Sequence, residues 1–312
     1  MKGLELARAY YAECGAPMIH AQFPEYEEIL GIGLTGSGSE CWGFDDEISR
    51  DHDFEPGFCI FLPGEDVVDR RTAFQMERAY AKLPAEFMGF HRQTIAPAGG
   101  ARHGVFRLEE WFRGKLGFDP DVMTMEDWLR VPEYALAEAV NGEVFRDDAE
   151  LWTDLRRKLG AMPEDALRKR LAGHLTQMGR SGQYNYARCL AHGETGAARL
   201  ALTEFTEHCM SALFLLNGRY KPYYKWSFRA LRTLPDGDVP AEDLTYLLTA
   251  EDGGDGEEKL LRIDTLVSRV IDLLQARELT AAVCMDLGKH AESVNDGIRD
   301  GGIRNLNLLA CV

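Results

Sequence analysis

Basic side chains and long apolar runs are both scarce in this sequence. It has 35 lysines and arginines against 51 aspartates and glutamates, which gives a formal net charge of −16. Binding to DNA or RNA without sequence preference needs clustered cations, so this balance argues against an extended nucleic acid as a partner. No apolar stretch approaches the length that spans a bilayer, so we expect no membrane association.

Paired cysteines and a secretory leader are also lacking. The seven cysteines are scattered, and none forms a C-x-x-C pair, which argues against a zinc site and against a disulfide framework. The first residues carry charges and no apolar core of the signal-peptide kind. We therefore expect a cytoplasmic protein with free thiols.

The hydrophobic pattern changes near residue 120, and the change predicts two domains. Before it, short apolar runs bounded by glycine or proline predict strands at residues 29–34, 53–62 and 103–108. After it, the strand signal fades and helical periodicity dominates. We predict an α+β protein with a sheet-containing domain over residues 1–120 and an all-α domain over residues 121–312.

A glycine-serine turn follows the first predicted strand, and a pair of aspartates stands at the start of the second. In the turn, residues 36–39, glycine lets the backbone approach a phosphate, and free amides and a serine hydroxyl can hold its oxygens. Asp51 and Asp53 are two positions apart, which in a strand puts both carboxylates on one face. Such a pair suits Mg²⁺, which would bridge to triphosphate oxygens. Each half of the pattern is common alone, but the two in this order are far more specific.

This segment resembles the nucleotidyltransferase superfamily signature, G-S-x-x-x-G followed by D-x-D. Five residues match it, and Gly36 and Ser37 offer an alternative phasing of the same turn; the matching residues are Gly38, Ser39, Gly43, Asp51 and Asp53. The sequence departs from the usual pattern at His52, where the superfamily has a small apolar residue. The turn is not a P-loop, because the G-K-[ST] ending is missing.

A longer stretch resembles the bacterial family DUF4037. The similarity runs from Gly36 to Phe61 and continues at Trp128-Leu129, Pro132-Glu133, Gly142–Phe145 and Leu216–Trp226. The resemblance implies a minimal nucleotidyltransferase fold, with a mixed β-sheet and flanking helices over residues 1–120. It also implies that residues 121–312 form a helical, acceptor-binding domain like that of kanamycin nucleotidyltransferase.

The resemblance assigns roles to individual residues of the first domain. Asp51 and Asp53 would hold Mg²⁺, with Mn²⁺ as an alternative, and Gly36, Ser37, Gly38 and Ser39 would bind a nucleoside triphosphate, with ATP as the first choice. Related enzymes have a third carboxylate on a later strand, which serves as general base or metal ligand. Glu109 is the first candidate and Glu110 the second, although both are equally typical of acids in the first turn of a helix.

A second cluster lies in the helical part, at Arg219–Trp226. It holds four aromatic and three basic residues in eight, which is unusual in an acidic protein. In related enzymes a lysine and a tyrosine of the helical domain reach the β- and γ-phosphates. The resemblance assigns this task to Lys225 with Tyr220 or Tyr223, and less strongly to Arg219 and Lys221. Alternatively, the aromatic rings pack between domains and the cations are solvated.

The predicted activity is Mg²⁺-dependent transfer of a nucleoside monophosphate from a nucleoside triphosphate to a hydroxyl acceptor, with release of pyrophosphate. The acceptor would be a small molecule or a macromolecule. One alternative is a catalytically degenerate, nucleotide-binding regulatory module. Another is a protein- or tRNA-modifying nucleotidyltransferase of the toxin–antitoxin type. A third carboxylate within reach of the metal would favour the enzyme over the regulatory module.

Overall fold

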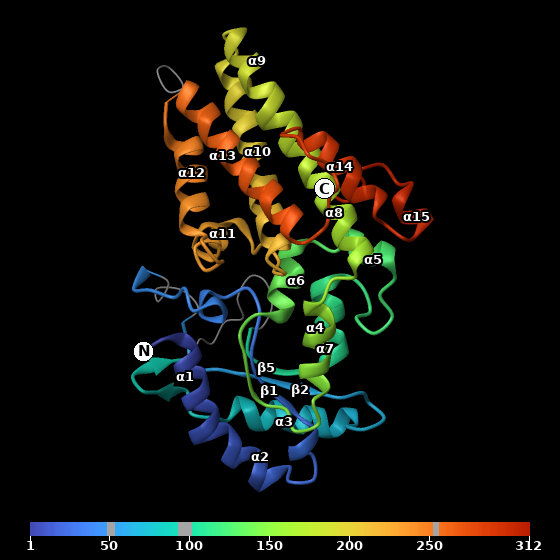
Figure 1. Cartoon of the computed structure of the whole chain (residues 1–312). Coiled ribbons are helices and arrows are strands. Elements are labelled where there is room, and N and C mark those ends of the chain that lie inside the picture. The colour runs from blue at the N-terminus through green and yellow to red at the C-terminus, as the bar shows by residue number, and fades with distance from the viewer. Residues whose placement is uncertain (49–53, 93–101, 252–255) are drawn as a thin grey trace. The chain divides into compact units, whose positions relative to one another are not determined.

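The computed structural model describes residues 1–48, 54–92, 102–251 and 256–312, which form two compact units (Figure 1). The first unit joins Met1–Met123 with Ala135–Gly160, and the second joins Thr124–Tyr134 with Ala161–Val312. The domain boundary near residue 120 stays a prediction. Residues 135–160 group with the first unit because they add a strand to its sheet. Among the described residues, no helix is long and apolar enough to cross a membrane.

A mixed four-stranded sheet forms the centre of the first unit, with the strand order β5-β2-β1-β6. Its strands are β1 (Gly31–Leu34), β2 (Cys59–Leu62), β5 (Gly104–Arg107) and β6 (Glu143–Arg146). β1 is antiparallel to β2 and β6, whereas β2 and β5 are parallel. Residues that follow β1 therefore lie at the same end of the sheet as residues that precede β2 and β5. We call this the turn end, and the opposite end the far end.

Helices cover both faces of the sheet, which explains why its central strands are apolar throughout. The face with Ile32 and Ile60 shares a core with three helices: α1 (Gly3–Tyr10), α2 (Ala16–Gln22) and α3 (Arg70–Ala81). On the other face, the ring centroid of Phe61 lies 5.4 Å from that of Trp111 and 4.6 Å from that of Trp152. These tryptophans come from α4 (Leu108–Leu116) and α7 (Leu151–Gly160).

The second unit contains helices and no strand among its described residues. Figure 1 shows its long helices α8 (Glu164–Met178), α10 (Thr195–Leu216) and α13 (Gly256–Ala276) side by side. α10 is central, because every side chain from Cys209 to Leu216 is buried. The remaining helices include α5 (Met125–Arg130), α9 (Tyr186–Ala191), α11 (Tyr224–Leu231), α12 (Asp238–Thr249), α14 (Leu287–Asp296) and α15 (Gly301–Arg304).

The predicted fold class is confirmed: a mixed sheet with flanking helices is followed by a largely helical region. The three predicted strands appear as β1, β2 and β5, each shorter than its apolar run. β6 was not predicted, because its sequence Glu-Val-Phe-Arg is short, half-buried and flanked by charges. It follows α6 (Glu133–Val140), a helix that begins in the second unit and continues in the first.

Candidate functional site

The glycine-serine turn leaves β1 at the turn end of the sheet. Gly36 has a φ of 126°, a conformation that a residue with a Cβ rarely adopts. Ser37 is exposed, Ser39 is half-buried, and a short 3₁₀ helix runs from Ser39 to Trp42. Within the described residues, the amides of Ser37, Gly38 and Ser39 donate no hydrogen bond. The turn therefore offers three backbone donors and a hydroxyl to an anion.

The side chain of Asn141 holds this turn in place. Its Oδ1 accepts from the Gly36 amide at 3.0 Å and from Thr35 Oγ1 at 3.1 Å, and its Nδ2 donates to the Gly36 carbonyl at 2.7 Å. The Gly142 amide donates to the Cys41 carbonyl at 2.9 Å, on the other side of the turn. Sequence reasoning missed Asn141; the Asn-Gly pair before a short apolar segment was the available signal.

Gly142 is required at its position for steric reasons. Its φ is 68°, and a Cβ there would lie 1.9 Å from the carbonyl oxygen of Leu34. Only glycine lets the chain pass this close to the end of β1 before it turns into β6. The backbone of β1 and the Asn141 side chain thus fix the turn from two directions.

Two buried carboxylates lie near the turn. Glu40 is 8% exposed, and its Oε1 would lie 1.9 Å from a Cβ on Gly38, so the carboxylate covers that glycine. Asp45 is 2% exposed and accepts from the Gly3 amide at 2.9 Å. Asp45 therefore fastens the start of α1, whereas Glu40 faces the turn itself.

Asp51 and Asp53 lie outside the described residues, so their role as metal ligands stays a prediction. Within the described part of the chain, no group of three or more histidine, cysteine, aspartate or glutamate residues could hold a metal ion. Phe54 follows Asp53 directly, and its ring would lie 3.3 Å from a Cβ on Gly3. Glu40, which faces the turn, flanks the same glycine, so Phe54 lies near the turn end of the sheet.

Glu109 lies on the first turn of α4, at the far end of the sheet, and its role as the third carboxylate stays a prediction. β5 pairs in parallel with β2, so Arg107 is level with Leu62, and α4 begins directly afterwards. The two ends of the sheet are roughly 10 Å apart along a four-residue strand. The Glu109 side chain is half exposed and forms an ion pair with Arg113, one helical turn onward.

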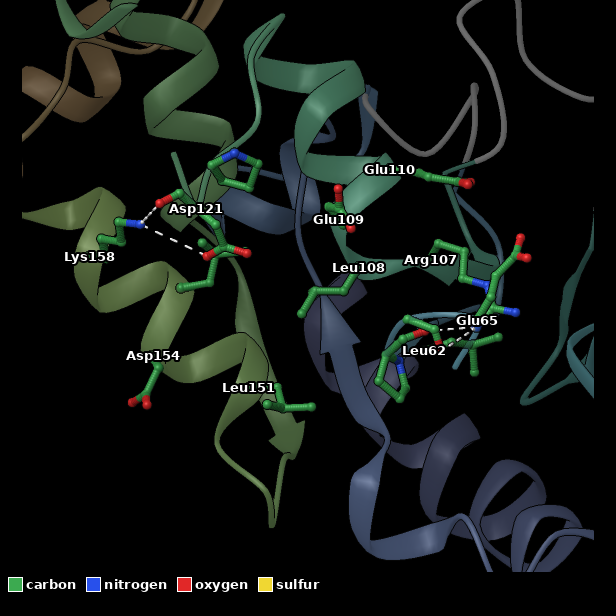
Figure 2. Close-up of a pocket in the computed structure, with 14 residues that line it drawn as sticks. Leu62, Glu65, Arg107, Leu108, Glu109, Glu110, Asp121, Leu151, Asp154 and Lys158 are labelled. Carbon is green, nitrogen blue, oxygen red and sulfur yellow. Dashed lines mark hydrogen bonds and ion pairs between the residues drawn. The ribbon is translucent and has the colours of Figure 1, made fainter. Parts of the chain in front are cut away.

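Glu109 and Glu110 line a cavity of about 460 Å³ at the far end (Figure 2). Figure 2 shows both glutamates on the first turn of α4, just beyond Arg107, with Asp154 and Lys158 of α7 across the cavity. Lys158 Nζ donates to the Asp121 carbonyl at 2.8 Å. Both acids therefore behave as first-turn helix residues, which is the alternative that the sequence left open.

The first residues of the Arg219–Trp226 cluster are bonded to neighbouring side chains or buried, whereas later ones are exposed. Arg219 Nη1 donates to Thr233 Oγ1 at 2.9 Å, and Lys221 Nζ lies 2.5 Å from Glu207 Oε2. Burial raises the pKa of Tyr220, whose side chain is 7% exposed.

The exposed half of the cluster consists of Tyr223, Tyr224 and Lys225. Lys225 Nζ lies 5.4 Å from the ring centroid of Trp226. Within the described residues Lys225 forms no ion pair, so its charge is available to a phosphate. The assignments of Lys225, Tyr223 and Arg219 to a nucleotide stay predictions.

Residues 128–227 match the family model described as "Domain of unknown function (DUF4037)". All the similar segments that we note beyond residue 120 lie within this match. The chain therefore contains a DUF4037 domain, and the resemblance to that family is confirmed over about a third of its length.

Among solved structures, a nucleotidyltransferase-like protein from Exiguobacterium sibiricum matches 88% of this chain and 76% of its own. The sequence identity is 14% and the TM-score is 0.35. No curated protein matches the chain.

Proposed function

We propose that the protein is a nucleotidyltransferase that binds a nucleoside triphosphate at the Gly36–Ser39 turn. The observation that carries the proposal is the turn itself. Its three free amides lie at the sheet end that Phe54, the neighbour of Asp53, also approaches, and Asn141 fixes its backbone. A rigid set of donors costs little reorganisation when an anion binds.

In this proposal the amides of Ser37, Gly38 and Ser39 and the Ser39 hydroxyl hold phosphate oxygens. Asp51 and Asp53 hold Mg²⁺, and their hard carboxylate oxygens suit that ion or Mn²⁺. When bound, the metal neutralises charge on the triphosphate. The resemblance also predicts that Lys225 adds a point charge on the phosphates. The residues accelerate transfer to a hydroxyl acceptor by positioning it and by stabilising charge.

Thermal unfolding with each of the four nucleoside triphosphates, with and without Mg²⁺, tests the proposal. A ligand at about one hundred times its Kd should stabilise the protein by roughly 2.7 kcal/mol. We expect this gain to require Mg²⁺ and to vanish in the double variant Asp51→Asn/Asp53→Asn. The variant Asp264→Asn/Asp272→Asn removes the same charge from exposed positions of α13 and should respond like wild type. No stabilisation by any of the four nucleotides would contradict the proposal.

A catalytically degenerate, nucleotide-binding module is the second candidate, and the position of Glu109 favours it. Glu109, the first candidate for the third carboxylate, lies at the far end of the sheet, whereas the buried Glu40 faces the turn. Radiolabelled nucleotide distinguishes the two functions: an enzyme attaches label to an acceptor in a cell extract and releases pyrophosphate. A degenerate module binds the nucleotide and does neither.

Replacing Glu109 is expected to leave nucleotide binding unchanged. Because its side chain is exposed and forms an ion pair with Arg113 of the same helix, Glu109→Gln should alter the Kd for the Mg²⁺-nucleotide by less than about twofold. Titration calorimetry on Glu109→Gln and the neighbouring Glu110→Gln measures this. If Glu109→Gln loses nucleotide binding and Glu110→Gln does not, Glu109 is part of the nucleotide site.

A further inference from the structure

The second unit contains a cavity of about 400 Å³ within the DUF4037 match. Residues of α6, α8 and α10 and of the segment before α11 line it. Its volume is near the lower limit for small-molecule sites in proteins, so it suits a small metabolite. All the residues that line it belong to the second unit.

The floor of the cavity holds two buried side chains, Arg170 and Ser211, each with a donor that makes no hydrogen bond within the described residues. Arg170 is 4% exposed, and its Nε and Nη2 donate to the carbonyl oxygens of Trp128 and Val131. Its Nη1 lies 4.0 Å from Glu133 Oε1 and makes no hydrogen bond within the described residues. Ser211 is 3% exposed, and its hydroxyl also makes none there. Buried donors are normally paired, so an acceptor oxygen of a ligand would complete this floor.

The charges that line the cavity sum to zero. Arg170 and Lys221 are cations, whereas Glu133 and Glu207 are anions. Both oxygens of Glu133 are engaged, since His174 Nε2 lies 3.0 Å from Oε1 and the Lys221 amide lies 3.4 Å from Oε2. Glu207 is different, because its side chain is half exposed and meets only the Lys221 ammonium on one side. A ligand with one anionic and one cationic group would leave the net charge of the cavity at zero, whereas a phosphate dianion would make it negative.

Three exposed tyrosines surround the opening of the cavity. Tyr134 and Tyr223 have ring centroids 6.1 Å apart at an interplanar angle of 76°, and those of Tyr223 and Tyr224 are 4.4 Å apart. Their exposed fractions are 45%, 47% and 68%. Exposed aromatic rings next to charged groups offer apolar contact and a favourable surface for an ammonium group.

We propose that this cavity binds a free α-amino acid. The carboxylate accepts from Arg170 Nη1 and the Ser211 hydroxyl, the ammonium faces Glu207, and the side chain lies against the three tyrosines. This assignment gives both donors a hydrogen-bond acceptor and preserves the neutral balance of charges in the cavity.

Titration calorimetry with each proteinogenic amino acid tests the proposal on the full chain. We expect saturable binding of at least one, with L-phenylalanine as the reference probe for the aromatic rim. For any amino acid that binds, the matching amine and the matching carboxylic acid should each bind at least about tenfold more weakly, because each lacks one charged partner. Binding of no amino acid at millimolar concentration, or equal binding of either fragment, would overturn the proposal.

Two variants locate the binding. Ser211→Ala should weaken binding of the amino acid by roughly tenfold. Its stability should change little, because the hydroxyl makes no hydrogen bond within the described residues. Tyr184→Ala removes an exposed tyrosine that contacts Arg188 elsewhere in this unit and should bind like wild type. Unchanged binding in Ser211→Ala would refute the site. Inorganic phosphate is tested as a competitor. If it displaces the amino acid and no longer binds to Ser211→Ala, the cavity is a phosphate site and the proposal is overturned.

Discussion

Asn141→Ala is expected to abolish Mg²⁺-dependent stabilisation by nucleoside triphosphates and to lower the free energy of unfolding of the first unit by about 3 kcal/mol. The side chain makes two hydrogen bonds to Gly36 and accepts one from Thr35. Each contributes about 1 kcal/mol, and the Gly36 peptide would be left buried without a partner. Without this support the turn loses the geometry that presents its three amides together.

The effect on binding can be separated from the loss of stability. Asn141→Asp retains an oxygen that can accept from the Gly36 amide and from Thr35, but it cannot donate to the Gly36 carbonyl. Its nucleotide binding and stability should therefore lie between those of wild type and Asn141→Ala. Asn295→Ala is the matched control, because Asn295 of the second unit accepts from Lys169 and donates to the Arg304 carbonyl. It should lose stability and keep nucleotide binding.

Urea denaturation measures the stability of each asparagine variant, and calorimetry at a temperature where the variant is folded measures its nucleotide binding. Asn141→Ala that is folded and binds the nucleotide with the affinity of wild type would show that the turn is not the nucleotide site.

The strands could be predicted because burial on both faces leaves a simple signal. β1 and β2 are four-residue segments in which every residue is buried, and such runs stand out against polar flanks. β6 lacks that signal, since Glu143 and Arg146 occupy its ends and it pairs only with β1 among the described strands. β6 forms because β1 is available to pair with it, so it is set by the tertiary structure and not by its own sequence.

The site was predictable only where it is local in sequence. The glycine-serine turn was identified from four consecutive residues, Gly36–Ser39, and the φ of 126° at Gly36 agrees with a glycine requirement there. Asn141 stands 105 positions from Gly36, and no local pattern reports such a contact. The sequence does not give the direction of β5, and its parallel pairing with β2 places α4, with Glu109, at the far end of the sheet.

Buried histidines in the second unit lead to a prediction about pH. His174 connects Glu133 to His208, with His174 Nε2 3.0 Å from Glu133 Oε1 and His174 Nδ1 2.9 Å from His208 Nδ1. Burial, together with the nearby His174 and Lys221, lowers the pKa of His208 from 6.5 to about 3, although Glu133 acts in the opposite direction. His208 therefore stays neutral in the folded protein under conditions in which an unfolded histidine is charged.

The stability of the second unit should consequently fall as the pH decreases below 6.5. Between pH 6.5 and about 3, the unfolded chain binds a proton at His208 that the folded chain does not bind, so stability rises with pH there. The slope is on the order of 1 kcal/mol per pH unit. Burial alone would raise the pKa of Glu133, but His174, Arg170 and Lys221 outweigh it and lower that pKa below its usual 4.5. Glu133 therefore adds to the loss only below about pH 4.5.

Hydrogen exchange of α8 and α10 amides between pH 6.5 and 4.5, corrected for the intrinsic exchange rate, measures this slope in the second unit. His208→Gln removes the titrating group and should flatten the profile by the contribution of one proton. His192→Gln removes an exposed histidine of the same unit and should retain the slope of wild type. A His208→Gln profile as steep as that of wild type would mean that His208 takes up its proton in the folded state. The hydrogen-bonded series Glu133–His174–His208 would then hold a protonated His208 in the folded protein. Groups other than His208 would cause the loss of stability in acid.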